Sequence, residues 1–335
     1  MAKTTVLLIN LGTPDSPSVG DVRSYLSQFL NDPRVIDIPW LLRKFLVNLI
    51  IVPFRAPKSA KIYQKLWTPK GSPIIFHGEK VKALLQDRLG AEYSVELAMR
   101  YKNPAISDVL ERVRKSNPDR IVVIPLFPQY ASASTGSALQ EVMEVVRNWW
   151  VIPQLTLISQ YWDHPGFIRA LVERGRQYDW RQYDHVLFSY HGLPERQVDK
   201  IYDAGLCAEH DCQHRVTEEN KYCYKAACYG TTRLLAQGLG IPSENYTVCF
   251  QSRLDKKWLR PFSDRVIVEQ AKKGVRKLLV FSPAFVADCL ETTIEIGDEY
   301  QQLFTEHGGE KVQLVESLND HPVWIEALED LVKMH

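Results

Sequence analysis

The stretch VLLINLGTP at residues 6–14 is repeated in outline by VLFSYHGLP at residues 186–194. Both stretches begin with a short apolar run, and both end in Gly followed two residues later by Pro. Short apolar runs bounded by turn residues are typical of buried strands. The chain therefore carries the same opening unit twice.

Three further pairs of stretches match in the same order along the chain. YSVELAMR (93–100) resembles YTVCFQSR (246–253), and RIVVIP (120–125) resembles KLLVFSP (277–283). The tripeptide Asp-His-Pro occurs at 163–165 and at 320–322, each time before a helical pattern. An ordered series of internal matches predicts two similar halves.

Helical patterns, such as those at 77–89 and 218–238, separate the strands of each half. This alternation predicts an α/β fold with two similar Rossmann-like domains that face each other across a cleft, each a four-stranded parallel sheet flanked by helices. We expect a first domain at 1–165 with an apolar lip insertion at about 31–75, and a second at 166–320 with a Cys-rich insertion at about 203–228. A last helix at 321–335 is expected to pack back on the first domain.

Composition excludes several classes of protein. The 335 residues carry a net charge of +1, 24% charged and 45% hydrophobic residues, which is typical of a globular chain and gives no basic surplus for nucleic acid. Six Cys are too few for a disulfide scaffold, and the N-terminus lacks a signal-peptide pattern. No run reaches the ~18 apolar residues of a membrane span. We expect a cytoplasmic protein with reduced thiols.

The most apolar segment, residues 36–54, is interrupted by charged residues and Pro. Its first part, residues 40–46, predicts a short amphipathic helix with a basic face. Such a segment is either ordinary core or a surface that lies on a bilayer or admits an apolar ligand.

Functional side chains are expected at the carboxyl ends of the strands, where ligands bind in parallel sheets. These positions are Leu11, Gly12, Arg100, Gln129, His191, Ser252 and Pro283. A lone His is more often structural, but His191 ends a strand at the predicted cleft, and imidazole is the usual proton acceptor near neutral pH.

An acidic row follows the strand at 278–281. It comprises Asp288, Glu291, Glu295, Asp298 and Glu299, whose spacing places them near one face of a helix. A solvated acidic face is the common cause of such a row. Because this row starts at a strand end, we interpret it as a track for a divalent cation or a proton.

Taken together, five motifs resemble the ferrochelatase family over essentially the whole chain. They are LGTP at 11–14, PQY at 128–130 with STG at 134–136, SYHGLP at 189–194, QSR at 251–253 and DCLET at 288–292. The resemblance implies insertion of Fe²⁺ into protoporphyrin IX with release of two protons, the last step of haem synthesis. Porphyrin and ferrous iron are the implied partners.

The resemblance also assigns residues. His191 and Glu291 match the family's catalytic and metal-handling positions, and Glu295 and Glu299 match an acidic conduit leading away from them. The positions matched for porphyrin binding are Leu11, Arg55, Lys58, Tyr63, Ser72, Arg100, Tyr101, Tyr130 and Trp258. Arg55, Lys58 and Ser72 among them would hold the propionates, and the lip would rest on the inner face of the membrane that delivers the porphyrin. Cys289 departs from the His that many members carry.

Four Cys in the second insertion resemble the [2Fe-2S] ligands of some bacterial members. They are Cys207, Cys212, Cys223 and Cys228. Ser132 stands where the animal type has its internal Cys, and the chain ends at His335 without the C-terminal Cys triplet of that type. Four thiolates suit [2Fe-2S], while structural zinc, with His210 or His214 as a ligand, and free thiols stay open as alternatives.

Three other functions are consistent with the same motifs. A coproporphyrin ferrochelatase would need extra basic residues near Arg55, and a cobalt or nickel chelatase would be richer in His at the metal site. A porphyrin- or haem-binding protein, or a redox sensor, on the same scaffold could lose His191 or Glu291. Both residues are present.

Overall fold

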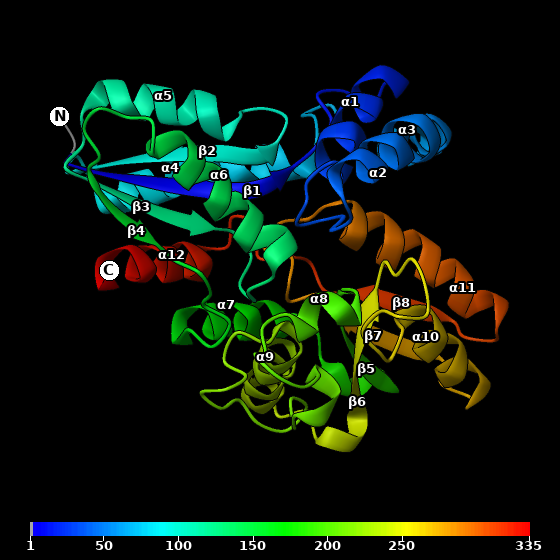
Figure 1. Ribbon diagram of the computed structural model, residues 1–335. Helices are drawn as coiled ribbons and strands as arrows, with labels where there is room; N and C mark the ends of the chain where they lie inside the picture. The colour runs from blue at the N-terminus through cyan, green and yellow to red at the C-terminus, as the bar shows by residue number, and fades with distance from the viewer. Residues whose placement is uncertain (1–2) are drawn as a thin grey trace. The chain divides into compact units, whose positions relative to one another are not determined.

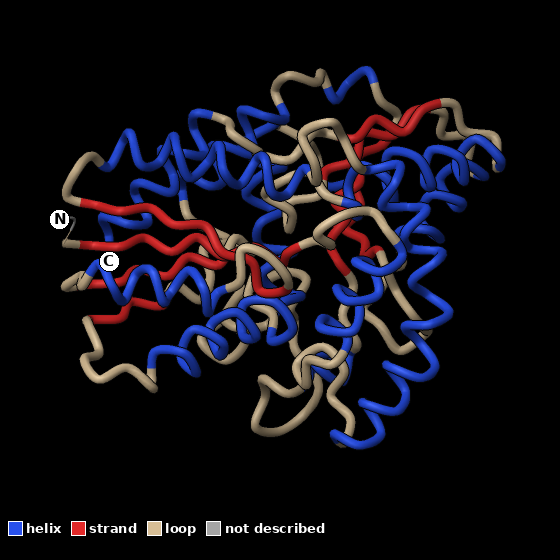
Figure 2. Tube along the Cα trace, turned by 90° about the horizontal axis from the view of Figure 1, so that it is seen from above, coloured by secondary structure: helices blue, strands red, loops and turns tan. Residues whose placement is uncertain are grey.

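The structure is a computed structural model that describes residues 3–335. The chain divides into two compact units. Unit 1 holds the residues up to Phe127, Ser132–Gln160 and Leu328–His335, and unit 2 holds Pro128–Ala131 and Tyr161–Ala327. Each unit is built on one four-stranded sheet with helices on its faces (Figures 1 and 2).

All the strand pairs in both sheets are parallel. The unit 1 sheet has the order β2-β1-β3-β4, with β1 (Thr4–Gly12), β2 (Tyr93–Tyr101), β3 (Arg120–Pro125) and β4 (Gln154–Leu157). The unit 2 sheet has the matching order β6-β5-β7-β8, with β5 (His185–His191), β6 (Tyr246–Gln251), β7 (Lys277–Phe281) and β8 (Lys311–Leu314). The predicted α/β class, with two four-stranded parallel sheets flanked by helices, and the predicted repeat of two similar halves are confirmed.

The helices complete each unit. Those of unit 1 are α1 (Val19–Leu30), α2 (Trp40–Phe45), the π-helix η1 (Leu46–Ile51), α3 (Val52–Leu66), α4 (Pro73–Leu89), α5 (Ile106–Ser116), the π-helix η2 (Ser132–Gly136) and α6 (Ser137–Val146). Those of unit 2 are α7 (Pro165–Gly175), α8 (Glu195–Asp199), α9 (Tyr224–Leu239), α10 (Ser263–Lys272), the π-helix η6 (Leu290–Tyr300) and α11 (Gln301–Glu306), with short 3₁₀ turns at Trp180–Gln182, Cys207–Glu209 and Ser243–Asn245. Helix α12 (Pro322–Met334) begins in unit 2 and ends in unit 1.

The central strands are apolar on both faces because helices cover both faces. Val6, Leu7, Leu8 and Ile9 of β1 are all fully buried. On one side of the unit 1 sheet Leu7 and Ile9 pack with α5 and α6, and in unit 2 strands β5–β7 pack with α10, η6 and α11. These two cores hold the strand ends in place, and the strand ends carry the candidate site.

The strand register tests the sequence matches residue by residue. Val6 pairs with Val95 and Val122, whereas Val186 pairs with Tyr246 and Leu279. The first- and third-strand matches agree with this register. The second-strand match is wrong by two residues, since Tyr246 corresponds to Val95 and not to Tyr93. A shift of two residues keeps every side chain on the same face of the sheet. The pattern of apolar residues therefore does not reveal this error.

Two local predictions also need correction. Helix α9 begins at Tyr224, because residues 218–223 form turns that carry Cys223. Of the two basic residues of helix α2, only Lys44 is exposed. Arg43 is only 6% exposed, and its guanidinium donates to the carbonyls of Ile36 and Ile38 at 3.2 and 2.9 Å. The apolar side chains of α2 point outward instead.

Candidate active site

His191 is the last residue of β5 and is half-buried. Its Nδ1 lies 2.6 Å from the carbonyl oxygen of Gly192, and its ring centroid lies 6.4 Å from those of both Trp258 and Phe285. The hydroxyl of Tyr224 donates to the His191 carbonyl at 3.0 Å. Because Nδ1 contacts a carbonyl, which only accepts, the proton of the neutral ring belongs on Nδ1 and Nε2 keeps its lone pair.

Gly192 makes this close arrangement possible. A Cβ at that position would come within 2.7 Å of the Gln251 carbonyl and 3.2 Å of the Trp258 ring. Gly12 ends β1 in the same way, with φ +107° and a Cβ position 1.9 Å from the Tyr101 carbonyl. Each repeat motif therefore needs Gly because the first strand of the sheet ends against the backbone of the second.

The acidic row lies on a π-helix, η6, rather than on an α-helix. π-Helices are rare, and single π turns are frequent at functional sites. Within η6, Glu295 accepts four hydrogen bonds: from Gln251 Nε2 (3.1 Å), Ser252 N (2.8 Å), Ser252 Oγ (2.6 Å) and Tyr300 Oη (3.0 Å). Burial, together with the charge of Glu295, raises the pKa of Tyr300, which keeps the phenol protonated as a donor. These four hydrogen bonds hold the side chain of Glu295 in place.

Gln251 ties Glu291 to the same group, because its Nε2 also donates to the Glu291 carbonyl at 2.8 Å. Gln251 Oε1 in turn accepts from Ser189 Oγ at 2.8 Å. Since Gln251 pairs directly with His191 in the sheet, one amide connects the end of β5 to the backbone of Glu291. Glu299 lies further along η6 and is exposed.

Asp288 and Cys289 do not belong to the helical row. Asp288 precedes η6 and accepts from Ser317 N (3.1 Å) and Asn319 Nδ2 (2.8 Å), so it stabilises the loop after β8. Cys289 is 9% exposed, and burial followed by the charge of Glu291 raises the pKa of its thiol well above that of a free Cys. The predicted five-residue face is therefore wrong at its first member.

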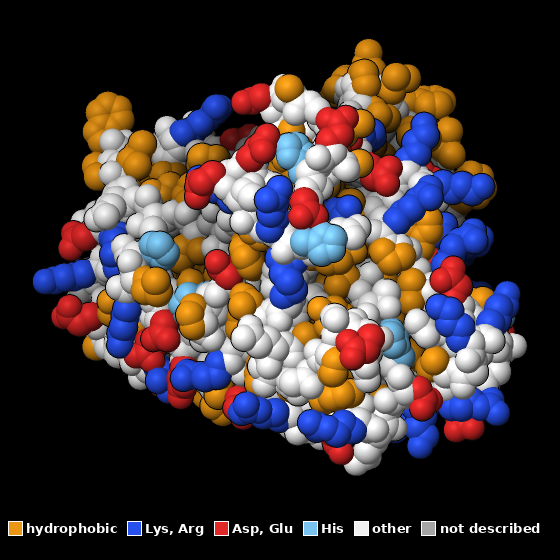
Figure 3. Space-filling model, turned by 90° about the horizontal axis from the view of Figure 1, so that it is seen from below, with side chains coloured by type: hydrophobic (Ala, Val, Ile, Leu, Met, Phe, Trp, Pro, Cys, Tyr) orange, Lys and Arg blue, Asp and Glu red, His pale blue; other side chains and the backbone are white. Residues whose placement is uncertain are grey.

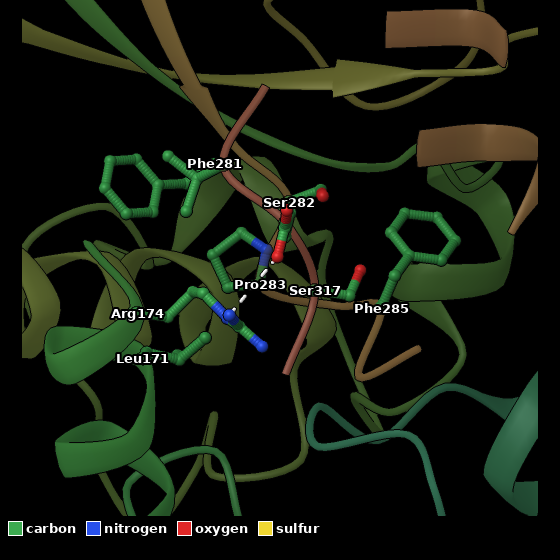
Figure 4. Close-up of a pocket in the computed structure, with 9 residues that line it drawn as sticks. Leu171, Arg174, Phe281, Ser282, Pro283, Phe285 and Ser317 are labelled. Carbon is green, nitrogen blue, oxygen red and sulfur yellow. Dashed lines mark hydrogen bonds and ion pairs between the residues drawn. The ribbon is translucent and has the colours of Figure 1, made fainter. Parts of the chain in front are cut away.

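A small pocket lies at the carboxyl ends of β7 and β8 (Figure 4). Its volume is about 10 Å³, enough for about one water and far below that of an organic ligand. Arg174 extends into it from α7, and its Nη1 lies 3.2 Å from Glu316 Oε2. Phe285 lines the pocket, and its ring centroid lies 6.4 Å from that of His191. The pocket wall therefore supports Phe285 and is not a porphyrin site.

In unit 1, the predicted porphyrin residues Arg100 and Tyr101 are bound to a buried carboxylate that the sequence analysis missed. Asp32 is 6% exposed and contacts Arg100 Nη2 (2.8 Å), Tyr101 Oη (2.9 Å) and Ser137 Oγ. Tyr101 is fully buried, and Arg100 also lies 3.3 Å from Glu141. Asp32 stands between a helix end and Pro33, and no motif there signals its role.

The predicted propionate-binding residues divide into two groups. Arg55 and Lys58 are exposed on α3, where they are available to an anion. Tyr63 is 9% exposed with its ring 6.2 Å from that of Tyr25, and Ser72 is 3% exposed at the start of α4. Of these four residues, only the two charged ones, Arg55 and Lys58, are exposed.

The other predicted substrate residues lie at strand ends or in loops. Leu11 is half-buried near the end of β1, and Trp258 forms a backbone bridge with Pro194. Tyr130 is half-buried in unit 2, with its ring 6.0 Å from that of Tyr222. Trp258 is thus the predicted porphyrin residue that the structure brings next to His191.

Three of the four predicted cluster ligands come together. The sulfurs of Cys207, Cys212 and Cys223 are 3.6–4.0 Å apart and buried. Tyr202 Oη and Asn220 Nδ2 lie 3.2 and 3.5 Å from Cys212 Sγ. Hydrogen bonding, first from Cys207, lowers the pKa of Cys212.

Cys228 is outside this group, whose ligand atoms all lie within 4.8 Å of one another. It is fully buried within α9, and this burial raises the pKa of its thiol well above that of a free Cys. Cys223 is the N-cap residue of α9 in an extended conformation, and Cys228 lies five positions later inside the helix.

Comparisons with known proteins identify the family. The ferrochelatase family model matches residues 3–335. A ferrochelatase of Coxiella burnetii (strain Dugway 5J108-111) is 42% identical over 337 residues, covering 99% of this chain and 93% of that protein, and one of Legionella pneumophila (strain Lens) is 42% identical over 328 residues, covering 98% of each. SirB from Bacillus subtilis, solved with Fe³⁺, has a TM-score of 0.56 at 13% identity and covers 99% of this chain and 94% of its own, which supports the fold alone. With its whole described length matched, this chain belongs to the ferrochelatase family of metal-chelating lyases, which insert iron into porphyrin in haem biosynthesis.

Proposed function

We propose that this ferrochelatase acts on protoporphyrin IX and Fe²⁺, with His191 as the proton acceptor. The observation that carries this proposal is the contact of His191 Nδ1 with the Gly192 carbonyl, which leaves Nε2 as an acceptor beside two aromatic rings, those of Trp258 and Phe285. Apolar aromatic faces suit a flat macrocycle. The base is thus presented among groups that bind the substrate and do not compete for its proton.

The reaction must remove two protons from the pyrrole nitrogens as Fe²⁺ enters. In our proposal, His191 Nε2 takes one proton from a pyrrole nitrogen, and the carboxylate of Glu291, which also guides the metal, receives the other. Glu295 serves a different purpose, because four donors already occupy it and hold η6 against β6. Glu299, exposed further along η6, would start the conduit from solvent.

The cations of α3 are proposed to bind the propionates. Arg55 and Lys58 are exposed there together with Lys61 and Lys65, and no acidic residue lies between positions 40 and 66. This concentration of positive charge also favours a second candidate, coproporphyrin, which has four propionates. The exposed apolar side chains on the same segment favour protoporphyrin, which has two.

An anaerobic assay with Fe²⁺ and each porphyrin tests these alternatives. We expect haem formation with a kcat/KM for protoporphyrin at least about tenfold above that for coproporphyrin, a difference of about 1.4 kcal/mol. A reversed ratio would establish the coproporphyrin enzyme. Tight porphyrin binding without metallation of either substrate would contradict catalysis and favour a porphyrin-binding protein.

We propose further that the Cys207–Cys212–Cys223 group holds a resident metal centre. Three convergent, buried sulfurs with one of lowered pKa fit a soft, thiolate-bound metal. When bound, a [2Fe-2S] cluster would supply one-electron chemistry and would need a fourth ligand, for which Cys228 is the candidate. Zinc would need one further ligand, for which His210 is placed with its ring stacked on Tyr202 at 4.0 Å.

Metal analysis and absorption spectra of anaerobically purified protein separate these centres. For [2Fe-2S] we expect two irons per chain and a red-brown colour, lost in Cys223→Ser and in Cys228→Ser. Cys249→Ser is the matched control, because Cys249 is an equally buried Cys on β6 outside the group. Zinc that survives Cys228→Ser would make His210 the fourth ligand, and metal-free protein would contradict the proposal.

The third part of the proposal concerns location: a cytoplasmic protein that rests on the inner face of the membrane. No helix in residues 3–335 is long and apolar enough to cross a bilayer. The apolar lip, defined as the exposed apolar side chains between Trp40 and Phe54, offers the contact. It comprises Trp40, Leu41, Leu42, Phe45, Leu49, Ile50 and Phe54, which are 44–75% exposed. Apolar side chains beside cations are typical of helices that lie on anionic lipid, and we expect vesicle binding that falls as salt rises.

A further inference from the structure

A second group of exposed apolar side chains lies on unit 1, far along the chain from the apolar lip. In the loop between α6 and β4, Trp150 is 101% exposed, Val151 69% and Ile152 57%. We call Trp150–Ile152 the apolar spur. Met143 of α6, at 46%, is also exposed. The remaining exposed large hydrophobics described in unit 1 are single residues such as Leu84, and scattered single residues need no explanation.

Packing and backbone hydrogen bonds fix the chain on both sides of the spur. Trp149, its neighbour in the chain, packs against the core formed by α5, α6 and the sheet. The Trp149 N–H donates to the Val146 carbonyl at 2.9 Å, and the N–H of Gln154 donates to the Asp119 carbonyl at 3.1 Å on the other side of the spur. The loop is therefore fixed at both ends, and Trp150 is presented outward by a structure that buries its neighbour.

The spur is too small for a stable contact between two copies of the chain. Trp150 can bury at most about 250 Å², and Val151 and Ile152 are smaller. A standard protein interface buries about 800 Å² on each partner. A second copy would therefore leave most of such an interface to be supplied by polar surface.

A lipid surface fits the apolar spur better than a second copy of the chain does. The loop 147–154 contains one basic residue, Arg147, and no acidic residue, so nothing in it repels an anionic bilayer. Trp is enriched at the headgroup level of membranes, where its ring is partly apolar and its N–H stays hydrated. In addition, Figure 3 shows hydrophobic side chains standing out at two corners of the same edge of the molecule, over the α2–α3 segment and over the α6–β4 loop.

We propose that the apolar spur is a second membrane contact, which inserts into the headgroup region of an anionic bilayer while the apolar lip inserts at its own end of unit 1. This inference rests on the lip contact proposed above. Two weak contacts on one rigid unit bind far more tightly than either alone, because the second binds at a high effective concentration. The two contacts would also fix which face of unit 1 is turned to the bilayer.

Co-sedimentation of the full chain with vesicles of phosphatidylcholine and phosphatidylglycerol tests the proposal. We expect Trp150→Glu to weaken binding about tenfold, since burial of a large apolar side chain accounts for at least that factor. Phe54→Glu in the lip should weaken it comparably. Leu84→Glu, on the surface of α4, is the matched control and should bind as the wild type does. Metallation of detergent-dispersed porphyrin should be unchanged in Trp150→Glu, because the spur does not take part in the reaction.

Each alternative gives a different result. If Phe54→Glu weakens binding and Trp150→Glu does not, the spur proposal is overturned and the lip contact stands. If the wild type does not bind vesicles, both contacts are overturned, while metallation in detergent still reports separately on the proposed enzyme. A dimer in light scattering that dissociates in Trp150→Glu would assign the spur to a second copy instead.

Discussion

The two sheets share strand order and register, but the residues at the carboxyl ends of their strands make different contacts. Leu11 and His191 hold equivalent places at the end of the first strand, and Arg100 and Gln251 correspond on the neighbouring strand. In unit 1 the second-strand residue closes a buried ion pair with Asp32. In unit 2 it holds the backbone of Glu291 and the carboxylate of Glu295. The same framework therefore holds a buried ion pair in one unit and a hydrogen-bonded carboxylate in the other.

The comparison extends past the third strand. Each unit continues from that strand into a π-helix, η2 in unit 1 and η6 in unit 2. Three of the five residues of η2 carry hydroxyls, whereas four of the eleven residues of η6 are acidic. Because the π-helix occurs in both units, it belongs to the shared framework. The two units differ in the side chains that this π-helix carries.

The strongest test of this difference exchanges the equivalent residues for Ala. His191→Ala should lower kcat by about 10²–10⁴, the range expected for loss of a general base, with porphyrin Kd little changed. Leu11→Ala should raise KM a few-fold and keep kcat, because Leu11 offers only an apolar contact. Steady-state kinetics and porphyrin fluorescence titration measure both. Wild-type turnover in His191→Ala would end its assignment as the base.

The strand ends could be predicted from the sequence because a two-fold repeat of apolar runs shows where parallel strands begin and end. The error of two residues in the second strand arose because apolar alternation is unchanged by an even shift. It paired Arg100 with Arg253, when the register makes Gln251 the counterpart of Arg100. The function of Gln251 in unit 2 follows from that register and not from its motif.

Long-range polar contacts could not be predicted. Asp32 lies in a loop far in sequence from Arg100 and Ser137, and only folding brings them together. The spacing of the acidic row indicated an α-helix, and a π-helix shares enough of that spacing to be mistaken for one. Sequence distance alone groups Cys228 with the other three Cys, and it does not show that only Cys207, Cys212 and Cys223 among the described residues bring their sulfurs together.

Breaking the buried ion pair tests whether unit 1 uses its strand end for stability. Asp32→Ala removes the buried acceptor of Arg100, Tyr101 and Ser137 and leaves Arg100 with Glu141 alone, and we expect the free energy of unfolding to fall by about 3–5 kcal/mol. Asp15→Ala is the control, since its pair with Lys102 is more exposed and should contribute less than about 1 kcal/mol. Urea denaturation followed by circular dichroism measures both. Equal small losses would show that Asp32 is not a structural centre of unit 1.

A smaller effect is expected from the counterpart in unit 2. Gln251→Leu removes the donor to Glu291 and Glu295, and should lower the free energy of unfolding by about 1–3 kcal/mol. Because Gln251 positions η6 and does not touch porphyrin, kcat should fall about tenfold with KM nearly unchanged. Thr232→Val, which breaks the buried hydrogen bond with Tyr190 in the same unit, should lower stability alone. If kcat falls as much in Thr232→Val as in Gln251→Leu, then Gln251 affects activity only through the stability of unit 2.

The smallest effect concerns Cys289, which stands where unit 2 passes from β7 into η6. A thiol reacts with alkylating agents as the thiolate, so the rate for an ordinary Cys rises about tenfold per pH unit below its pKa. Burial and the nearby Glu291 raise the pKa of Cys289 well above the usual range, which keeps the thiolate fraction minute at pH 8. We expect mass spectrometry to find Cys289 unmodified by iodoacetamide at pH 8 in the folded protein and fully modified in urea. Rapid modification of the folded protein would instead reveal an accessible thiolate, and Cys289 would then join Glu291 as a candidate metal ligand at the point where the two units differ most.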